Sequence, residues 1–151
     1  MLKPKKNQIF KKKNLIKILK ISDPFLMIEE LKILNRSNFS HGLKSINSNE
    51  WFYKCHFLDN PVMPGTLQVE AMLQTIVSTL YISEKTNNQK YLITKSNTNF
   101  YKKISGNGKL LIKSRIIYKK NGAAHATAIS YFNKKKVNEG NFQFFYPNIF
   151  K

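Results

Sequence analysis

The chain has 151 residues, of which 42% are hydrophobic, and its 26 lysines and arginines outweigh 8 acidic residues to give a formal net charge of +18. This length predicts one domain, spanning residues 1–151, that buries a sizeable core, and the hydrophobic content excludes a disordered basic tail. A single cysteine, Cys55, excludes an internal disulfide and a multi-cysteine metal site. We therefore expect a reducing compartment, the cytoplasm.

Lysine carries almost all of the positive charge, because only Arg36 and Arg115 are arginines. Three explanations fit this excess: compositional drift toward lysine, an acidic protein partner, and nucleic acid or an anionic membrane surface. Proteins that read nucleic acid rely on arginine for bidentate contacts, so a lysine-only excess weakens that explanation. No run of 18 apolar residues is present, so we expect no membrane insertion.

The first twenty residues are basic and free of acidic side chains, as in a presequence, but lysines interrupt every apolar run. We interpret residues up to about 11 as a basic extension. A short amphipathic helix, which Asp23-Pro24 ends, fits the apolar residues Ile9, Leu15, Ile16, Ile18 and Leu19.

Strands are predicted over residues 25–34 and 40–46, and residues 51–65 are expected to be irregular. Thr66 to Tyr81 contains no glycine or proline, and its apolar residues cover most of the helix circumference, which is typical of a buried helix. Alternating patterns then predict four strands, at residues 91–100, 110–118, 123–132 and 137–146. The fold predicted from this order is α+β, an antiparallel sheet of about six strands around one central helix.

Small side chains on one face of the strand at 123–132 support that arrangement, because a bulky element must lie close to them. These residues are Ala124, Ala126, Ala128 and Ser130. The buried helix is the obvious neighbour, since helices that pack closely on a sheet need small side chains beneath them.

Residues 55–84 contain no lysine or arginine, and the unusual polar residues of the chain lie in this gap. Glu70 falls within an almost wholly apolar helix, where an unpaired buried carboxylate costs several kcal/mol. It must therefore reach a cleft, be protonated or be paired, which are the conditions of a general acid or base. His56 lies in an aromatic loop, whereas His41 and His125 are interpreted as structural.

The spacing of the histidines and the cysteine predicts no metal site, and no phosphate-binding or serine-hydrolase motif is present. A hydrolase that uses Cys55 with His56 is disfavoured, because adjacent side chains of an extended segment point in opposite directions. A lone histidine in such a loop is more often structural than catalytic, so from the residues alone both interpretations of His56 stay open.

Residues 51–74 resemble a motif of the 3-hydroxyacyl-[acyl-carrier-protein] dehydratases of the FabZ and FabA types. The matching residues are Phe52, Cys55-His56-Phe57, Pro61-Val62-Met63-Pro64-Gly65, Leu67, Glu70-Ala71-Met72 and Gln74. The resemblance implies a hot-dog fold, in which the sheet wraps around the helix. It also implies an enzyme of fatty acid biosynthesis that converts (3R)-3-hydroxyacyl thioesters on acyl carrier protein into trans-2-enoyl thioesters, with no cofactor and no metal.

The same resemblance implies roles for individual residues. His56 corresponds to the base and Glu70 to the acid, Gly65 to the glycine whose amide binds the thioester carbonyl, and Gln74 to a residue that positions the acid. Family members are homodimers in which one subunit supplies the histidine and the other the acid, and a trimer of dimers is left open. We expect an acyl tunnel near the dimer interface. Its predicted lining is Phe57, Val62, Met63 and Leu67.

Several departures leave the subtype open. Cys55 and Leu58 replace the glycine and proline usual in FabZ-type enzymes, whereas Glu70 is the FabZ-type acid and FabA-type enzymes carry aspartate. Isomerisation of the double bond, the preferred chain length, and a polyunsaturated-lipid or polyketide pathway therefore stay open. The rival hypotheses are a non-catalytic or thioesterase-like hot-dog protein and a nucleic-acid-binding module.

The resemblance also gives the charge an interpretation, because acyl carrier protein is acidic and a basic rim would steer it to the tunnel. Lys119 and Lys120 correspond to positions where family members place basic docking residues. We interpret most other lysines as drift.

Overall fold

The computed structural model describes residues 7–34, 38–85 and 91–146. A seven-stranded sheet, antiparallel throughout, has the strand order β1-β2-β3-β5-β6-β7-β4. The strands are β1 (Gln8–Lys11), β2 (Glu30–Ile33), β3 (Phe39–Ile46), β4 (Leu92–Phe100), β5 (Gly108–Lys120), β6 (Ala123–Phe132) and β7 (Lys135–Phe145). The helices are α1 (Lys12–Leu19), the 3₁₀ helix η1 (Trp51–Lys54) and α2 (Gly65–Glu84). Within these residues no helix is long and apolar enough to cross a membrane.

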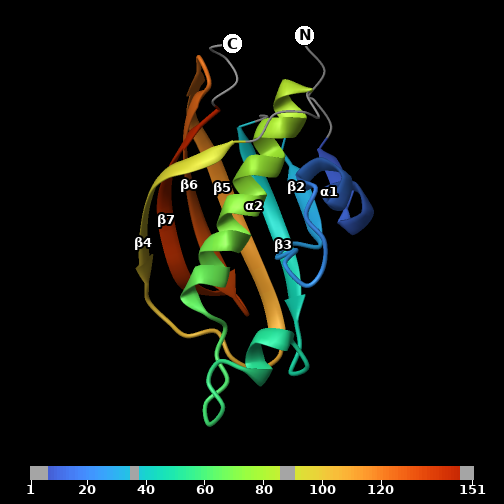
Figure 1. Ribbon diagram of the computed structural model, residues 1–151, viewed down its shortest axis with the longest axis vertical. Coiled ribbons are helices and arrows are strands. Elements are labelled where there is room, and N and C mark those ends of the chain that lie inside the picture. The colour runs from blue at the N-terminus through green and yellow to red at the C-terminus, as the bar shows by residue number, and fades with distance from the viewer. Residues whose placement is uncertain (1–6, 35–37, 86–90, 147–151) are drawn as a thin grey trace.

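Helix α2 lies lengthwise across one face of the curved sheet (Figure 1). Its sheet-facing side is apolar and buried, with Met72, Ile76 and Leu80 all inaccessible to solvent. The small side chains of β6 are buried as well, and α2 contacts this strand, as the pattern at 123–132 predicts. On β3, a Cβ added to Gly42 would lie 2.2 Å from Thr75 Oγ1. Helix and sheet therefore approach closely only because the strand residues beneath α2 are small.

The amino-terminal prediction is wrong in one respect, because Ile9 belongs to strand β1 and not to a helix. β1 pairs antiparallel with β2 and adds a seventh strand, so the basic extension cannot reach residue 11. The helix begins only at Lys12, where the backbone N–H of Lys11 donates to Asn14 Oδ1 at 3.1 Å. This bond caps the first turn of α1, directly after the strand.

The strand predicted over 25–34 is shorter than expected, since β2 covers only Glu30–Ile33. The residues that precede β2 form a turn in which Phe25 and Leu26 donate to the Ser22 carbonyl. The backbone of Phe25 and Met27 then bonds to the side chain of Gln74 instead of to a neighbouring strand. A buried polar side chain from α2 has replaced the sheet ladder here.

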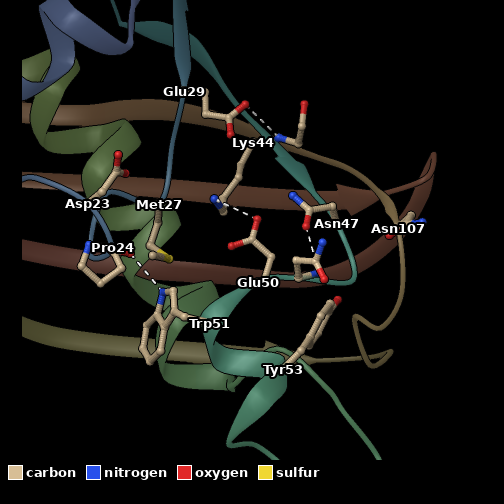
Figure 2. Close-up of polar contacts among 12 residues, drawn as sticks. Asp23, Pro24, Met27, Glu29, Lys44, Asn47, Glu50, Trp51, Tyr53 and Asn107 are labelled. Atoms are coloured by element: carbon tan, nitrogen blue, oxygen red, sulfur yellow. Dashed lines mark hydrogen bonds and ion pairs between the residues drawn. The ribbon is translucent and has the colours of Figure 1, made fainter.

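Polar contacts fix the connection from β3 to η1, which leads into the predicted site (Figure 2). Lys44 and Glu50 form an ion pair at 3.4 Å with both side chains largely buried. Trp51 Nε1 donates to the Pro24 carbonyl at 3.1 Å, and the Tyr53 hydroxyl donates to the Gly106 carbonyl at 3.1 Å. These contacts therefore hold η1 in place, and the segment that follows it starts from a fixed position.

Candidate active site

His56 lies in a compact loop that closes on itself between residues 55 and 62. The ring Nδ1 is 3.0 Å from the Val62 carbonyl, and the Val62 N–H donates to the His56 carbonyl at 2.9 Å. Because a carbonyl only accepts, Nδ1 donates this hydrogen bond, and in the neutral ring Nε2 is then the nitrogen with the lone pair. The ring packs on Phe57, with the two centroids 3.8 Å apart. The loop thus presents a half-buried imidazole that, in its neutral form, can accept a proton at Nε2.

Buried amides hold the far side of this loop. Gln68 Nε2 donates to the Met63 carbonyl at 3.0 Å, while Asn138 Nδ2 of β7 donates to Gln68 Oε1 at 2.7 Å. The Met63 N–H donates to the Ile104 carbonyl at 2.9 Å. Gln68 and Asn138 are almost fully buried, so this chain ties the Val62 carbonyl, and through it the His56 ring, to the sheet.

Gly65 is the first residue of α2, directly after Pro64 at the N-cap. Its N–H lies in the first turn, where amides have no partner within the helix and the helix dipole favours negative charge. A Cβ at this position would lie 3.2 Å from the Phe100 ring, so the glycine lets Phe100 lie against the backbone. His56, Gly65 and Phe100 line one cavity of about 470 Å³, together with Thr66 and Val69 of the helix.

Glu70 lies one turn further along α2, where Gln74 holds it. Gln74 Nε2 donates to Glu70 Oε1 at 2.8 Å and to the Phe25 carbonyl at 2.9 Å, and its Oε1 accepts from the Met27 N–H at 2.7 Å. Gln74 is 2% exposed, and both hydrogens of its Nε2 and its Oε1 oxygen take part in these bonds. It therefore has one orientation and presents an N–H to the carboxyl group, while its positioning role stays a prediction.

Burial raises the pKa of Glu70 above its ordinary value, and the hydrogen bond from Gln74 offsets part of that increase. The protonated form of the carboxyl group is accordingly more populated near neutral pH than for an exposed glutamate. This property suits a group that must give a proton to a leaving hydroxyl.

Within the chain, His56 and Glu70 line different cavities. His56 faces the cavity at Gly65 and Phe100, whereas Glu70 and Gln74 line another, of about 350 Å³, with residues further along α2. The arrangement can abstract a proton at one cavity and deliver one at the other. In the described part of the chain, no three histidine, cysteine, aspartate or glutamate side chains lie together as a metal site.

The residues predicted to line a tunnel are dispersed. Met63 and Leu67 are 2% and 8% exposed and belong to the core, although Met63 also borders a cavity with His56 and Val62. Phe57 is 58% exposed at the loop. The tunnel lining stays a prediction, and these four residues lie at the His56 end of α2.

Lys119 and Lys120 end strand β5, at the hairpin to β6. Lys119 Nζ donates to Ser83 Oγ at 2.9 Å and lies 3.6 Å from Glu84, so it is engaged with the carboxyl-terminal end of α2. Lys120 is exposed. Their docking role stays a prediction.

Sequence reasoning missed two lysines beside His56. Lys102 and Lys103 follow β4 and line a cavity of about 350 Å³ with His56, Gly65 and Phe100. It also missed Val77 and Tyr81, which share a face of α2 with Glu70 at steps of seven and eleven residues. The steps of seven and eleven residues can be seen in the sequence. Because apolar residues cover most of the helix circumference, however, the sequence does not distinguish the face that carries Glu70 from the buried face.

Comparison with known proteins identifies the family. The model of the FabA-like domain matches residues 21–141. The 3-hydroxyacyl-[acyl-carrier-protein] dehydratase FabZ of Bartonella quintana (strain Toulouse) is 33% identical over 127 residues, or 83% of this chain and 82% of that protein. The FabZ of Buchnera aphidicola subsp. Schizaphis graminum is 29% identical over 145 residues, covering 94% of this chain and 95% of that protein.

Among solved structures, the dehydratase heterocomplex ApeI:P from Xenorhabdus doucetiae superposes with a TM-score of 0.73 at 13% identity, covering 89% of this chain and 91% of that one. This likeness, together with the central helix wrapped by the sheet, confirms the predicted hot-dog fold. The family model matches most of this chain, and the Bartonella quintana relative is more than 30% identical to it. The chain therefore belongs to the FabA-like domain family.

Proposed function

We propose that this protein is a 3-hydroxyacyl-[acyl-carrier-protein] dehydratase of fatty acid biosynthesis, acting in the cytoplasm. The carrying observation is a pair of side chains held in place: the Val62 carbonyl fixes the His56 ring through Nδ1, and Gln74 holds a glutamate whose pKa burial raises. The family and its FabZ relatives supply the substrate class.

The reaction follows from these groups. His56 Nε2 removes a proton from C2 of the (3R)-3-hydroxyacyl thioester, and the electron pair moves toward the thioester carbonyl. The Gly65 N–H at the start of α2 donates to the carbonyl oxygen as negative charge develops there. The pair then forms the C2–C3 double bond as the C3–O bond breaks, and the Glu70 proton leaves with the hydroxyl as water. Transfer of the proton from His56 back to Glu70 restores both groups.

We propose further that two copies build each site together. Strand β4 ends the sheet, and both its faces are exposed, with Leu92, Ile93 and Phe100 each at least 43% accessible. A long exposed edge strand of this kind is a pairing surface. Pairing of two β4 edges, with the uncovered sides of the two α2 helices face to face, would bring His56 of one copy to Glu70 of the other. Assembly of such dimers into a trimer of dimers stays open.

An acidic carrier protein is the partner that this function requires, and basic side chains are available for it. Lys119 and Lys120 are the residues proposed for docking. If they dock the carrier, Lys120→Glu raises KM for carrier-linked substrates and leaves thioesters of a small thiol unaffected. Equal effects on both substrates would discard this role.

The test of the proposed function is conversion of 3-hydroxybutyryl to crotonyl thioester, followed in both directions. His56→Ala and Glu70→Ala should each lower kcat/KM at least about a hundredfold. His125→Ala is the matched control, because His125 lies on the outer sheet surface, with Nε2 2.6 Å from Asn141 Oδ1. Release of free thiol without dehydration would instead support the thioesterase-like alternative, and unchanged turnover in both active-site variants would refute the assigned roles.

A further inference from the structure

The face of the sheet that is turned away from α2 carries basic and aromatic side chains close together. Figure 1 shows α2 against one face of the sheet, and burial alternates along β3 and β6, so every second residue of these strands lies on the opposite face. We define the outer basic face as a group of these outward residues from four neighbouring strands: Lys32, Phe39, His41, Lys113, Arg115 and Tyr131.

Strand register brings the basic residues of this face together. His41 is paired with Lys32 on β2 and with Lys113 on β5, and Arg115 follows two residues after Lys113 on the same strand. Neighbouring strands are about 4.8 Å apart, and residues two apart in a strand are about 7 Å apart, so the backbone positions of these residues lie within roughly 12 Å of one another. The sequence conceals this group, because its members come from separate strands.

No acidic side chain of the described part of the chain neutralises these cations, since no ion pair there includes Lys32, Lys113 or Arg115. Burial, followed by the neighbouring Lys113 and then Lys32, lowers the pKa of His41 below its ordinary value, as expected where like charges lie close together. The positive charge of the face is therefore available to an anionic partner.

Each aromatic ring of the face lies next to one of the cations. Arg115 Cζ is 5.4 Å from the Phe39 ring centroid, and Lys113 Nζ is 5.1 Å from the Tyr131 ring centroid. Phe39 and Tyr131 are partly exposed, so the rings and the planar guanidinium form flat surfaces at the edge of the solvent. Proteins bind single-stranded nucleic acid with surfaces of this kind, on which bases stack on aromatic rings or arginine while cations bind the phosphates.

We propose that the outer basic face binds single-stranded nucleic acid, a second function that does not depend on the dehydratase site. Phosphates bind Lys32, Lys113 and Arg115, and bases stack on Phe39 and Tyr131. A second copy of this chain fits less well, because it would bring like charges together, and an acidic protein or an anionic membrane needs no stacking surface. The dimer proposed above leaves this face free, since its β4 edge is separated from β6 by β7.

Fluorescence anisotropy of a labelled oligouridylate of about 15 nucleotides tests the electrostatic part of this proposal. If three cations bind phosphates, a plot of the logarithm of the association constant against the logarithm of the salt concentration should have a slope of about −2, because single strands give about −0.7 for each phosphate. Lys113→Glu combined with Arg115→Glu should lower the affinity at least about tenfold and bring the slope about 1.4 closer to zero.

Lys13→Glu combined with Lys17→Glu is the matched control, because both lysines are exposed on α1 and the change in net charge is the same. This control should keep most of the affinity. An equal loss in the two double variants would show that net charge alone binds the oligonucleotide, and it would overturn the proposed face. Both variants should dehydrate the four-carbon thioester normally, which shows that they fold.

Phe39→Leu and Tyr131→Leu test the stacking part. Each should weaken binding at least about fivefold and leave the salt slope unchanged, because a ring is lost but no charge. In competition experiments, the single strand should displace the labelled probe at a lower concentration than duplex RNA or polyglutamate of equal charge. Equal competition by the duplex would overturn the stacking role, and equal competition by polyglutamate would identify an acidic protein as the partner instead. Wild-type protein that binds no single strand at low salt would overturn this inference and leave the proposed dehydratase function untouched, because turnover is measured separately.

Discussion

Gln74→Met is the substitution that most directly tests how the acid is held. The side chain keeps its length but loses all three hydrogen bonds, and the buried Met27 N–H and the part-buried Phe25 carbonyl are left without their partner. An orphaned buried group costs about 1–3 kcal/mol and a bond to a carboxylate about 1.5–3 kcal/mol. Because the three bonds share one amide and are not additive, we expect a loss of about 3 kcal/mol in the free energy of unfolding.

Denaturant unfolding at a fixed protein concentration measures this loss, and Gln143→Met, at an exposed position of β7, is the control for the chemical change. The pH profile of kcat separates positioning from stability. Gln74 lowers the pKa of Glu70, so its removal raises that pKa further and moves the alkaline limb of the profile to higher pH. A loss below about 1 kcal/mol, or an alkaline limb that stays in place, would refute the network.

Three further outcomes are expected. Glu70→Gln should raise the melting temperature near neutral pH, because a folded-state pKa above the unfolded value of 4.5 gives stability that is lost as pH rises; a difference from wild type that persists below pH 4.5 would contradict this. Gly42→Ala should cost about 1–3 kcal/mol in chemical denaturation through its clash with Thr75, and Thr75→Ala should relieve most of it; equal costs in both backgrounds would exclude the clash. Gln68→Met should lower kcat about tenfold by freeing the Met63 carbonyl and loosening the His56 loop, whereas an unchanged kcat would show that the loop needs no such support.

The sequence predicts the fold well where one pattern decides the structure. The helix at 66–81 and the four carboxyl-terminal strands appear within a few residues of their predicted ends, because burial periodicity and Asn-Gly turns act locally. Asn121 and Gly122, for example, both take the positive φ of a hairpin turn. The strand predicted at residues 25–29 does not form because their β-forming pattern is overridden by Gln74, which lies 45 or more residues away in the chain.

The sequence predicts which types of residue form the site, but it does not predict how these residues are arranged in space. The isolated carboxylate of Glu70 and the surrounding gap in lysines indicate acid–base chemistry through composition and position alone. The pairing of Gln74 with the backbone at Phe25 and Met27, and the loop bond from His56 to Val62, depend on tertiary contacts that no local pattern reports. The engagement of Lys119 with Glu84 likewise needs the hairpin to fold back onto α2.

Subunit exchange between His56→Ala and Glu70→Ala proteins tests the shared active site most directly. Each variant alone should be inactive, because each of its sites lacks either the base or the acid. In a mixed dimer, one of the two sites regains His56 from one copy and Glu70 from the other, so an equal mixture should recover about a quarter of wild-type activity. No recovery, in a mixture shown to contain mixed dimers, would contradict the account and place both groups within a single chain.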